Sequence, residues 1–541
     1  MSNAIFQVPI AINEPVLSYE PGSLERAELE RTIQRMKRSS KDIPMIIGGK
    51  KVRSKERVEI FAPHDLHNPL GKFSKGSKRE VERAVNAALA AKPAWEAMPW
   101  QERAAIFLKA ADLLAGPYRA RANAATMLGQ SKNVFQAEID CVAELADFYR
   151  FNVQYMTEIY EQQPESSDGI WNRLEYRPLE GFVFAITPFN FTSIAGNLPG
   201  APALLGNTVV WKCAQSQIYS ASLIIEILEA AGLPDGVINL LFVDGPDAGD
   251  VVFSHPEFAG LHFTGSTGVF NHLWQTIGQN LSNYRSYPRI VGETGGKDFV
   301  IAHASADPKE VSTALTRGAF EYQGQKCSAA SRAYIPKSLW KAVERNLQND
   351  LADMRMGSPE DFSNFFNAVI DEAAYKKISS YISRAKRDRN ARVIAGGSYS
   401  KREGYFIEPT VIQARDPKYR TMCEEIFGPV LTIYVYDEKR YSQTLKLLDE
   451  TSPYALTGSI FSRERGPIIE ATNTLRHAAG NFYINDKPTG AVVGQQPFGG
   501  ARGSGTNDKA GSILNLYRWL SARTIKETFV PPKNYRYPFM G

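Results

Sequence analysis

The chain has 541 residues, which is too long for a single hydrophobic core, so we expect two or three domains. Hydrophobic residues make up 43% and charged residues 22%, the proportions of an ordinary soluble protein. The formal net charge of +5 is small for this length, and the Lys and Arg residues are dispersed, so nucleic-acid binding is not indicated. The 4 cysteines stand far apart without metal-ligand spacing, which argues against a disulfide framework or a zinc site and for a reducing compartment.

The sequence also lacks the patterns of a membrane or targeting segment. It contains no run of about 20 apolar residues. Residues 1–13 are too short and too uncharged for a signal or transit peptide of the usual form. We therefore expect neither a membrane span nor an ordinary import leader.

The first 150 residues predict mainly helices. Residues 2–48 are irregular and then helical, with a surface helix expected at 23–38, and we interpret this region as an arm wrapped on the body. Ser77 and Glu80 form a capping box, in which a hydroxyl and a carboxylate bind free backbone N–H groups at a helix start. Further helical patterns predict a helical layer before any strong strand, at 101–114 and 135–148.

An alternating segment rich in Arg and Tyr, at 171–179, predicts an exposed strand or hairpin that makes a subunit contact. After Gly181, apolar runs alternate with helical stretches, which predicts a parallel sheet covered on both faces. These runs lie at 182–186, 208–211, 237–242 and 261–263, with a helix at 220–231. A second series starts at Glu293 and runs to about Asn507, so we expect a second α/β domain facing the first, with ligands at the carboxyl ends of strands.

The candidate catalytic segment runs from Phe320 to Arg332 (FEYQGQKCSAASR). Its Cys327 stands among polar residues, and Lys326 and Arg332 would put positive charge near the thiol, which favours the nucleophilic thiolate. Gly324 would give the thiol a flexible approach. The alternative is that Cys327 is a small buried hydrophobe, as many lone cysteines are.

Three polar side chains follow predicted strands. Asn190 could donate its amide N–H to a developing oxyanion, and Glu293, which precedes two glycines, could act as a general base. Lys212 could reach a ribose or a phosphate. Each residue is also an ordinary choice for a turn or a solvated strand end, and those interpretations stay open.

The stretch FTGSTG (263–268) follows a strand and opens a helix, where backbone N–H groups and the helix dipole receive a phosphate. Its GxxG spacing is less specific than GxGxxG, so a plain turn remains an alternative. Farther along, Glu425 offers a carboxylate for a ribose diol and Phe427 offers a ring for packing.

Six motifs, in this order, resemble those of the aldehyde dehydrogenase superfamily: TPFN (187–190), FTGS (263–266), ETGGK (293–297), GQKC (324–327), EEIFGP (424–429) and PFGG (497–500). The match covers about 46–527. The resemblance implies an α/β fold with three parts, namely a Rossmann-type NAD-binding domain (1–164 and 180–292), an α/β catalytic domain (293–509) and a small β oligomerisation arm (165–179 and 510–541). Such an arm is stable only against another subunit, so a homo-oligomer is implied, either a dimer or a multiple of dimers.

The resemblance also implies the chemistry. Cys327 would attack an aldehyde, Asn190 and the Cys327 backbone N–H would hold the oxyanion, and Glu293 would activate the water that releases the acid. The cofactor would be NAD, held by Lys212, Gly265, Ser266, Glu425 and Phe427, and no metal would be required.

Further stretches resemble the superfamily members that oxidise L-glutamate γ-semialdehyde, which is in equilibrium with 1-pyrroline-5-carboxylate, to L-glutamate in the second step of proline catabolism. They are QAEID (136–140), PFNF (188–191), FEYQGQKCS (320–328), GNFYINDK (480–487) and VGQQPFGGAR (493–502). The resemblance implies that the substrate carboxylate binds Ser328 and the backbone N–H groups of Gly490 and Ala491, as backbone donors can hold an anion. Phe191 and Phe498 would enclose the aliphatic chain, and Glu138 would either bind the ammonium or lie on a helix surface.

Three positions depart from the family pattern. Cys213 replaces a proline, Asp298 replaces an asparagine, and Gln215 replaces an acid, which leaves the preference for NAD over NADP open. Two other functions stay open, namely another semialdehyde dehydrogenase, such as one for succinate semialdehyde, and a non-catalytic binding relative. The family works in the mitochondrial matrix of eukaryotes and in the bacterial cytosol, so the resemblance implies one of these compartments.

Overall fold

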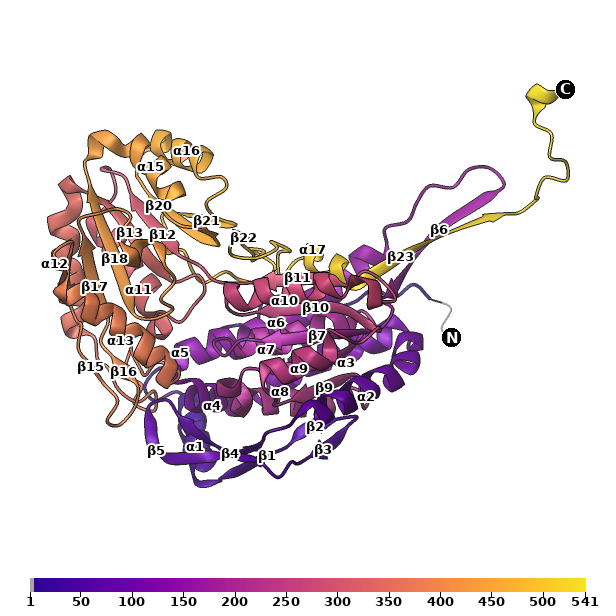
Figure 1. Ribbon diagram of the computed structural model, residues 1–541, viewed down its shortest axis with the longest axis horizontal. Coiled ribbons are helices and arrows are strands. Elements are labelled where there is room, and N and C mark those ends of the chain that lie inside the picture. The colour runs from indigo at the N-terminus through magenta and orange to yellow at the C-terminus, as the bar shows by residue number, and fades with distance from the viewer. Residues whose placement is uncertain (1–3) are drawn as a thin grey trace.

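The computed structural model describes residues 4–541, and residues 1–3, which include the start of the predicted arm, lie outside the described part. Two seven-stranded sheets, each flanked by helices, form the two halves of the molecule (Figure 1). A two-stranded antiparallel sheet projects from the half that contains the N-terminal residues, and we call it the projecting hairpin although its strands are distant in sequence. The C-terminus lies beyond the tip of this hairpin. The predicted α/β architecture is confirmed.

The first sheet has the strand order β11-β10-β7-β8-β9-β2-β3. Strands β7 to β11 run parallel to one another, and the inner strands are buried on both faces, which is why their sequences are apolar without alternation. Each of the four apolar runs predicted after Gly181 overlaps one of these strands. The strands are β2 (Met45–Ile47), β3 (Lys50–Val52), β7 (Phe182–Thr187), β8 (Thr208–Cys213), β9 (Ile238–Leu241), β10 (Phe258–Thr264) and β11 (Arg289–Glu293).

Helices of the first half surround this sheet and share one continuous apolar core with it. The predicted helices are confirmed, and the carboxylate of Glu80 accepts the Ser77 backbone N–H at 3.0 Å, as the capping box requires. The segment predicted as one helix at 135–148 contains a π-helical stretch, Glu138–Ala143, between two α-helices. The helices are α1 (Leu24–Arg38), α2 (Lys78–Ala97), α3 (Trp100–Ala115), α4 (Arg119–Gln130), α5 (Val134–Ala137), α6 (Glu144–Tyr160), α7 (Thr192–Leu204), α8 (Ile218–Ala231), α9 (Gly245–Val252) and α10 (Thr267–Gln279).

Five strands precede the helical layer, among them the 10-residue β5, so the prediction of a helical layer before any strong strand is wrong. Strands β2 and β3 add to the edge of the first sheet, while three others form a small separate sheet. These are β1 (Lys41–Ile43), β4 (Arg57–Ala62) and β5 (Asp65–Ser74). Three-residue strands are too short to show a period of two, which is why the sequence pattern did not reveal most of them.

The second sheet has the order β14-β17-β18-β13-β12-β20-β21 and packs against its own apolar clusters. Its strands are β12 (Asp298–Ala302), β13 (Ala330–Pro336), β14 (Ala391–Ala395), β17 (Thr410–Ala414), β18 (Val430–Tyr436), β20 (Thr457–Phe461) and β21 (Asn481–Ile484). Its helices are α11 (Pro308–Phe320), α12 (Lys337–Asp353), α13 (Glu372–Arg387), α14 (Arg420–Cys423), α15 (Tyr441–Glu450) and α16 (Arg465–Thr474). Two-residue strands β15 (Tyr399–Ser400), β16 (Phe406–Ile407), β19 (Tyr454–Ala455) and β22 (Ala501–Arg502) complete this half. The last helix, α17 (Ile513–Leu516), packs against α6 of the first half.

The projecting hairpin pairs β6 (Ile170–Pro178) antiparallel with β23 (Leu520–Thr528), with Pro178 opposite Leu520 and Ile170 opposite Thr528 (Figure 1). The predicted exposed strand at 171–179 is thereby confirmed. The segment 529–541 continues beyond the hairpin and is exposed throughout. Among the helices of residues 4–541, none combines the length and the apolar character that crossing a membrane would need.

Candidate active site

The predicted site residues meet where the two sheets join. Strand β11 of the first sheet ends at Glu293, and β12 of the second sheet begins at Asp298, so a short link connects them. The carboxyl ends of the parallel strands β7, β8 and β10 lie beside β11 at the same edge. Residues from both halves therefore come together at this link, as expected for open parallel sheets.

A sharp turn after α11 presents Cys327. Tyr322 and Gln323 are in the left-handed region, with φ of 49° and 56°, and Gly324 has φ of 64°. A Cβ on Gly324 would overlap the carbonyl oxygen of Gly428, so this glycine provides a close approach between two chain segments rather than the flexibility that the sequence suggested. The Gln323 amide holds the turn by donating to the carbonyls of Ser131 at 3.0 Å and Ala368 at 2.7 Å.

The expected electropositive setting of Cys327 is wrong. Lys326 turns away to carboxylates, with Nζ 3.6 Å from Asp140 and 3.5 Å from Glu321, and the Arg332 guanidinium donates to the Lys297 carbonyl at 2.8 Å. Burial raises the pKa of Cys327 well above its usual value, and the carboxyls of Asp298, Glu293 and Glu425 raise this pKa further. A thiol whose pKa is raised in this way would need a base before it could act as a nucleophile.

Asn190 lies in the turn between β7 and α7 and is buried. Its Nδ2 donates one N–H to the carbonyl of Gln325 at 3.1 Å, two residues before Cys327. This bond fixes the amide next to the turn that presents Cys327 and leaves its second N–H available to another acceptor. The geometry suits an oxyanion donor, since such a donor must be held rigidly before the reaction.

Glu293 ends β11 and is half-buried. Its Oε2 is buried and has no hydrogen-bond partner within residues 4–541. Burial raises the pKa of Glu293 well above its usual value, while the Lys509 ammonium acts in the opposite direction and lowers it. A carboxylate with a raised pKa is a stronger base, as a catalytic base working near neutral pH requires.

Two glycines after Glu293 create room for groups from the second half. A Cβ on Gly295 would lie 2.6 Å from the carboxylate of Glu425, and a Cβ on Gly296 would overlap the carbonyl oxygen of Cys327. The Gly296 N–H donates to Oε1 of Glu425 at 2.9 Å, which holds this carboxylate beside the link. The glycines thus admit Glu425 and the Cys327 backbone.

The other predicted cofactor residues lie around the same edge. Ser266 caps α10 by accepting the Val269 N–H at 3.4 Å, and Gly265 donates its N–H to the carbonyl of Glu293 at 3.1 Å. Lys212 stands near the end of β8, where burial lowers its pKa. Phe427 has φ of 60°, and its ring packs edge-on against Phe189 with centroids 5.8 Å apart.

The predicted substrate residues come from three separate segments. Ser328 follows Cys327, and its Oγ lies 2.7 Å from Oγ1 of Thr489. Thr489 immediately precedes Gly490 and Ala491, and Gly490 has φ of 97°. Phe191 lies at the start of α7, and Phe498 pairs with Ala510 in an isolated β-bridge. The structure therefore joins the hydroxyl beside the nucleophile to the glycine loop.

Comparison with known proteins identifies the family. The model of the aldehyde dehydrogenase family matches residues 51–525. The chain belongs to the aldehyde dehydrogenase family. A mitochondrial delta-1-pyrroline-5-carboxylate dehydrogenase of Dictyostelium discoideum is 52% identical over 536 residues, covering 98% of this chain and 96% of the relative. A delta-1-pyrroline-5-carboxylate dehydrogenase of Agaricus bisporus is also 52% identical, covering 99% of this chain and 98% of the relative.

A solved structure shows the same likeness in three dimensions. The delta-pyrroline-5-carboxylate dehydrogenase of Mycobacterium tuberculosis, described as bound with NAD, superposes on this chain with a TM-score of 0.97. The two chains are 54% identical, and the match covers 100% of each. The aldehyde dehydrogenase fold is therefore present over the whole length of the chain.

One part of this aldehyde dehydrogenase that sequence reasoning missed is a buried charge cluster behind Phe191. Lys132 is fully buried, and its Nζ donates to Oδ2 of Asp140 at 2.6 Å. The same Nζ lies 4.4 Å from the centroid of the Phe191 ring and 4.3 Å from the centroid of the Tyr322 ring. The cluster continues through Lys326 to Glu321. No local pattern reveals it, because its members come from two segments far apart in the sequence, the turn after α11 and the segment between α4 and α6.

Asp298 and Lys297, at the end of the link, have surroundings that the sequence did not predict. Asp298 is buried, and its Oδ1 accepts the Thr457 N–H at 2.7 Å, while burial raises its pKa to about 8. Lys297 is buried with no hydrogen-bond partner for Nζ among the described residues, and burial lowers its pKa to about 7. Asp298 raises the pKa of Cys327, and Lys297 interacts electrostatically with Glu425.

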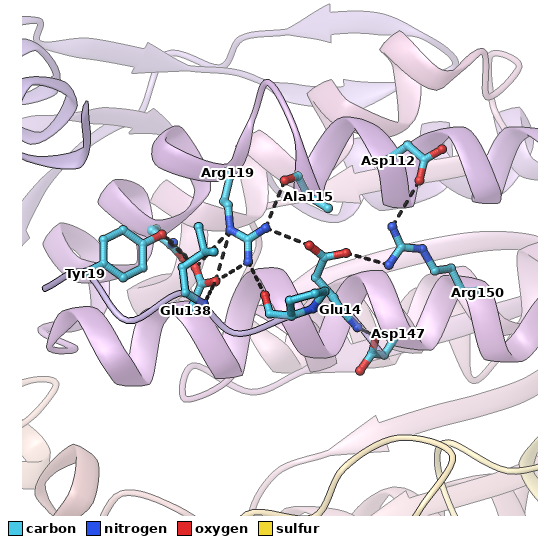
Figure 2. Close-up of polar contacts among 11 residues, drawn as sticks. Glu14, Tyr19, Asp112, Ala115, Arg119, Glu138, Asp147 and Arg150 are labelled. Atoms are coloured by element: carbon cyan, nitrogen blue, oxygen red, sulfur yellow. Dashed lines mark hydrogen bonds and ion pairs between the residues drawn. The ribbon is translucent and has the colours of Figure 1, made fainter. Parts of the chain in front are cut away.

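Both interpretations of Glu138 are wrong. Its carboxylate is fully buried and accepts hydrogen bonds from the Tyr19 hydroxyl at 2.9 Å, from Asn123 at 2.6 Å and from Arg119. Figure 2 shows this cluster, in which the N-terminal chain crosses the helices and Glu14 lies between Arg119 and Arg150. Glu138 therefore binds the N-terminal arm, and the prediction of an arm wrapped on the body is confirmed for its described residues.

Proposed function

We propose that this protein oxidises L-glutamate γ-semialdehyde to L-glutamate with NAD, as the second step of proline catabolism. The relatives named delta-1-pyrroline-5-carboxylate dehydrogenase are 52% identical to this chain over almost its whole length. The observation that carries the proposal is the hydrogen bond between Ser328, beside the nucleophile, and Thr489, beside Gly490. This contact supports the proposal because it joins the residue after Cys327 to the loop whose Gly490 and Ala491 N–H groups would bind the substrate carboxylate.

The residues of the NAD site fit the cofactor. A Cβ on Gly268 would meet nothing within 4 Å, so the start of α10 is open to a pyrophosphate, which the free N–H groups and dipole of a helix start bind well. Lys212 is partly desolvated near the end of β8, where it would bind the adenosine side of the cofactor. Glu425 and Phe427 would hold the nicotinamide ribose and ring. Bound NAD would supply the acceptor for the hydride that leaves the substrate carbon.

We propose that Cys327 attacks the aldehyde carbon. The sulfur–carbon bond forms as the thiol proton passes to Glu293, and the aldehyde oxygen becomes an oxyanion. The free N–H of Asn190 and the Cys327 backbone N–H would stabilise this oxyanion, and a single donor of this kind is worth roughly 3 kcal/mol. The raised pKa of the thiol makes the base necessary.

Oxidation leaves a thioester on Cys327. We propose that Glu293 first releases the thiol proton to solvent and then takes a proton from water, which attacks the thioester carbon. The carbon–sulfur bond breaks, the leaving sulfur of Cys327 takes the proton from Glu293, and L-glutamate is released. Glu293 suits this role because burial raises its pKa and its Oε2 is free to accept a proton. The same residue serves both steps because it lies close enough to Cys327 to raise the thiol pKa.

We propose that the substrate carboxylate binds the Ser328 hydroxyl and the N–H groups of Gly490 and Ala491, and that Phe191 and Phe498 enclose the methylene chain. In this proposal the NAD-binding domain comprises 1–164 and 180–292, and the catalytic domain comprises 293–509. The hairpin segments 165–179 and 510–541 form an arm that pairs with another subunit, since a lone two-stranded hairpin is marginally stable in water. The assembly is a dimer or a multiple of dimers.

The compartment is part of the proposal. The Dictyostelium relative carries the word mitochondrial in its name, whereas the Agaricus relative does not. We propose the mitochondrial matrix for a eukaryotic source and the cytoplasm otherwise. Localisation of a fluorescent fusion of the full chain, compared with a matrix marker, would decide between them.

The function is tested by following reduced cofactor with L-glutamate γ-semialdehyde, succinate semialdehyde and propanal, each with NAD and with NADP. We expect kcat/KM to be highest for L-glutamate γ-semialdehyde with NAD and activity to vanish in Cys327→Ala. A preference for succinate semialdehyde would refute the substrate while keeping the chemistry. Absence of turnover with all three aldehydes would refute an aldehyde dehydrogenase activity.

A further inference from the structure

The N-terminal strap, which we define as residues 11–19, lies across α4 and α6. The backbone N–H of Ala11 donates to Gln154 of α6 at 2.9 Å, and the backbone N–H of Leu17 donates to Glu138 at 3.0 Å. Between these two points the Glu14 carboxylate pairs with Arg119 at 2.8 Å and Arg150 at 2.7 Å (Figure 2). The strap is therefore fixed to the body at several positions along its length.

Asn13 connects the strap to a distant segment. Its Nδ2 donates to Oδ2 of Asp147 at 2.7 Å and to the carbonyl of Val493 at 2.8 Å. Its Oδ1 accepts from Nε2 of Gln495 at 2.9 Å. Both amide hydrogens and the amide oxygen are used, so an asparagine is the side chain that meets all three partners at once.

The partner segment is the 490–496 loop, which begins with the Gly490 and Ala491 of the proposed carboxylate site. The carbonyl of Val492 accepts the N–H groups of Gln495 at 3.0 Å and Gln496 at 2.9 Å, which closes the loop on itself. Gly494 has φ of 81°, and a Cβ there would overlap the ring of Phe151 on α6. The loop therefore rests on α6, and Asn13 fastens it from the other side.

We propose that Asn13 is a positioning residue for substrate binding, through which the N-terminal strap holds the 490–496 loop in the conformation that presents its N–H groups to the substrate carboxylate. This inference rests on the proposed function, because it assumes that Gly490 and Ala491 bind that carboxylate. It adds that the strap, about 480 residues away in the chain, sets the affinity for the substrate.

The contacts predict a selective effect. Within residues 4–541, the hydrogen bonds of Asn13 go only to α6 and to the loop. Cys327, Asn190 and Glu293 keep their own partners when Asn13 is changed, so the bond-making steps remain. Loss of Asn13 therefore raises KM for a substrate that carries a carboxylate and leaves KM for a plain aldehyde unchanged.

The test compares Asn13→Ala with Gln154→Ala in the full-length protein. Gln154→Ala removes a strap contact to the same helix without touching the loop, so it is the matched control. For Asn13→Ala we expect a rise in KM for L-glutamate γ-semialdehyde of about ten-fold, which corresponds to about 1.4 kcal/mol, with kcat within about two-fold. KM for propanal and for NAD stays at the wild-type value, and the control variant matches wild type for all three.

Hydrogen exchange gives a second measurement that needs no turnover. We expect the amides of 490–496 to exchange faster in Asn13→Ala than in wild type or Gln154→Ala. Equal exchange in all three proteins, or KM values that rise in parallel for both aldehydes, would overturn the inference. Failure of the proposed function is distinguishable, because wild type would then prefer another aldehyde, while the exchange of the loop would still show whether Asn13 holds it.

Discussion

The Oγ of Ser328 lies 2.7 Å from Oγ1 of Thr489, so the residue after the nucleophile is hydrogen-bonded to the residue before the glycine loop. Both hydroxyls are buried, and each is therefore a costly group to leave without a partner. We expect Ser328→Ala to raise KM for L-glutamate γ-semialdehyde by about 10- to 100-fold, since a bond to a charged group contributes about 1.5–3 kcal/mol. Kinetics with propanal, whose KM should not change, provide the control.

Glu293→Gln should impair both chemical steps. The amide cannot accept a proton from the Cys327 thiol or from water, so steady-state turnover should fall by about 10²- to 10⁴-fold. Rapid mixing should then show no fast burst of reduced cofactor. Glu424, an exposed carboxylate in the same motif as Glu425, provides the control, and Glu424→Gln should retain wild-type turnover. An equal loss of turnover in both variants would contradict the role of Glu293 as the base.

Asp298→Asn should make the thiol easier to ionise. Among the charged groups, Asp298 raises the pKa of Cys327 most, so removing its carboxylate lowers that pKa. Because the pKa of Asp298 itself is about 8, its negative charge is present mainly above pH 8, and the difference between variant and wild type should grow there. The alkylation rate of Cys327 by iodoacetamide as a function of pH measures this, with Cys327→Ala as the blank, and a profile unchanged by the substitution would refute it.

Asp140→Asn should destabilise the fold, because it leaves the Lys132 ammonium fully buried without its counter-charge. Breaking such a pair from one side costs about 3–5 kcal/mol, whereas replacing both partners by apolar residues costs less. Thermal unfolding should therefore begin at a lower temperature in Asp140→Asn than in Lys132→Met/Asp140→Leu. Glu344→Gln, which breaks a surface pair with Arg392, should unfold like wild type.

Removal of 529–541 should weaken the proposed assembly. This tail carries exposed apolar side chains that a lone subunit leaves in water, among them Phe529 at 61%, Val530 at 82%, Tyr535 at 78%, Tyr537 at 68% and Phe539 at 85%. Sedimentation should show a smaller mass for the truncated chain at micromolar concentration. Turnover per subunit should persist, since the catalytic residues lie in the two main halves, and an unchanged mass would remove the tail from the interface.

The sequence predicted the parts of this molecule that local patterns encode. Continuous apolar runs predicted β7 to β10, and ordered motifs pointed to Cys327, Glu293 and Asn190, which the fold brings into one region, because strand burial and family motifs both leave short, contiguous signals. It failed where partners are distant in sequence. Lys326 stands next to Cys327 in the sequence but points at Asp140, and Glu138 has the pattern of a surface helix but is covered by the N-terminal strap.

The link between the two sheets has a consequence for how the protein can change over time. Gly295 faces the carboxylate of Glu425, and Gly296 faces the carbonyl of Cys327, so a methyl group at either position collides with a different part of the machinery. The two collisions differ, because the Glu425 carboxylate ends a flexible side chain, whereas the Cys327 carbonyl belongs to the backbone. A saturation library should therefore show position 296 tolerating glycine only, while position 295 accepts a small side chain at the cost of displacing Glu425.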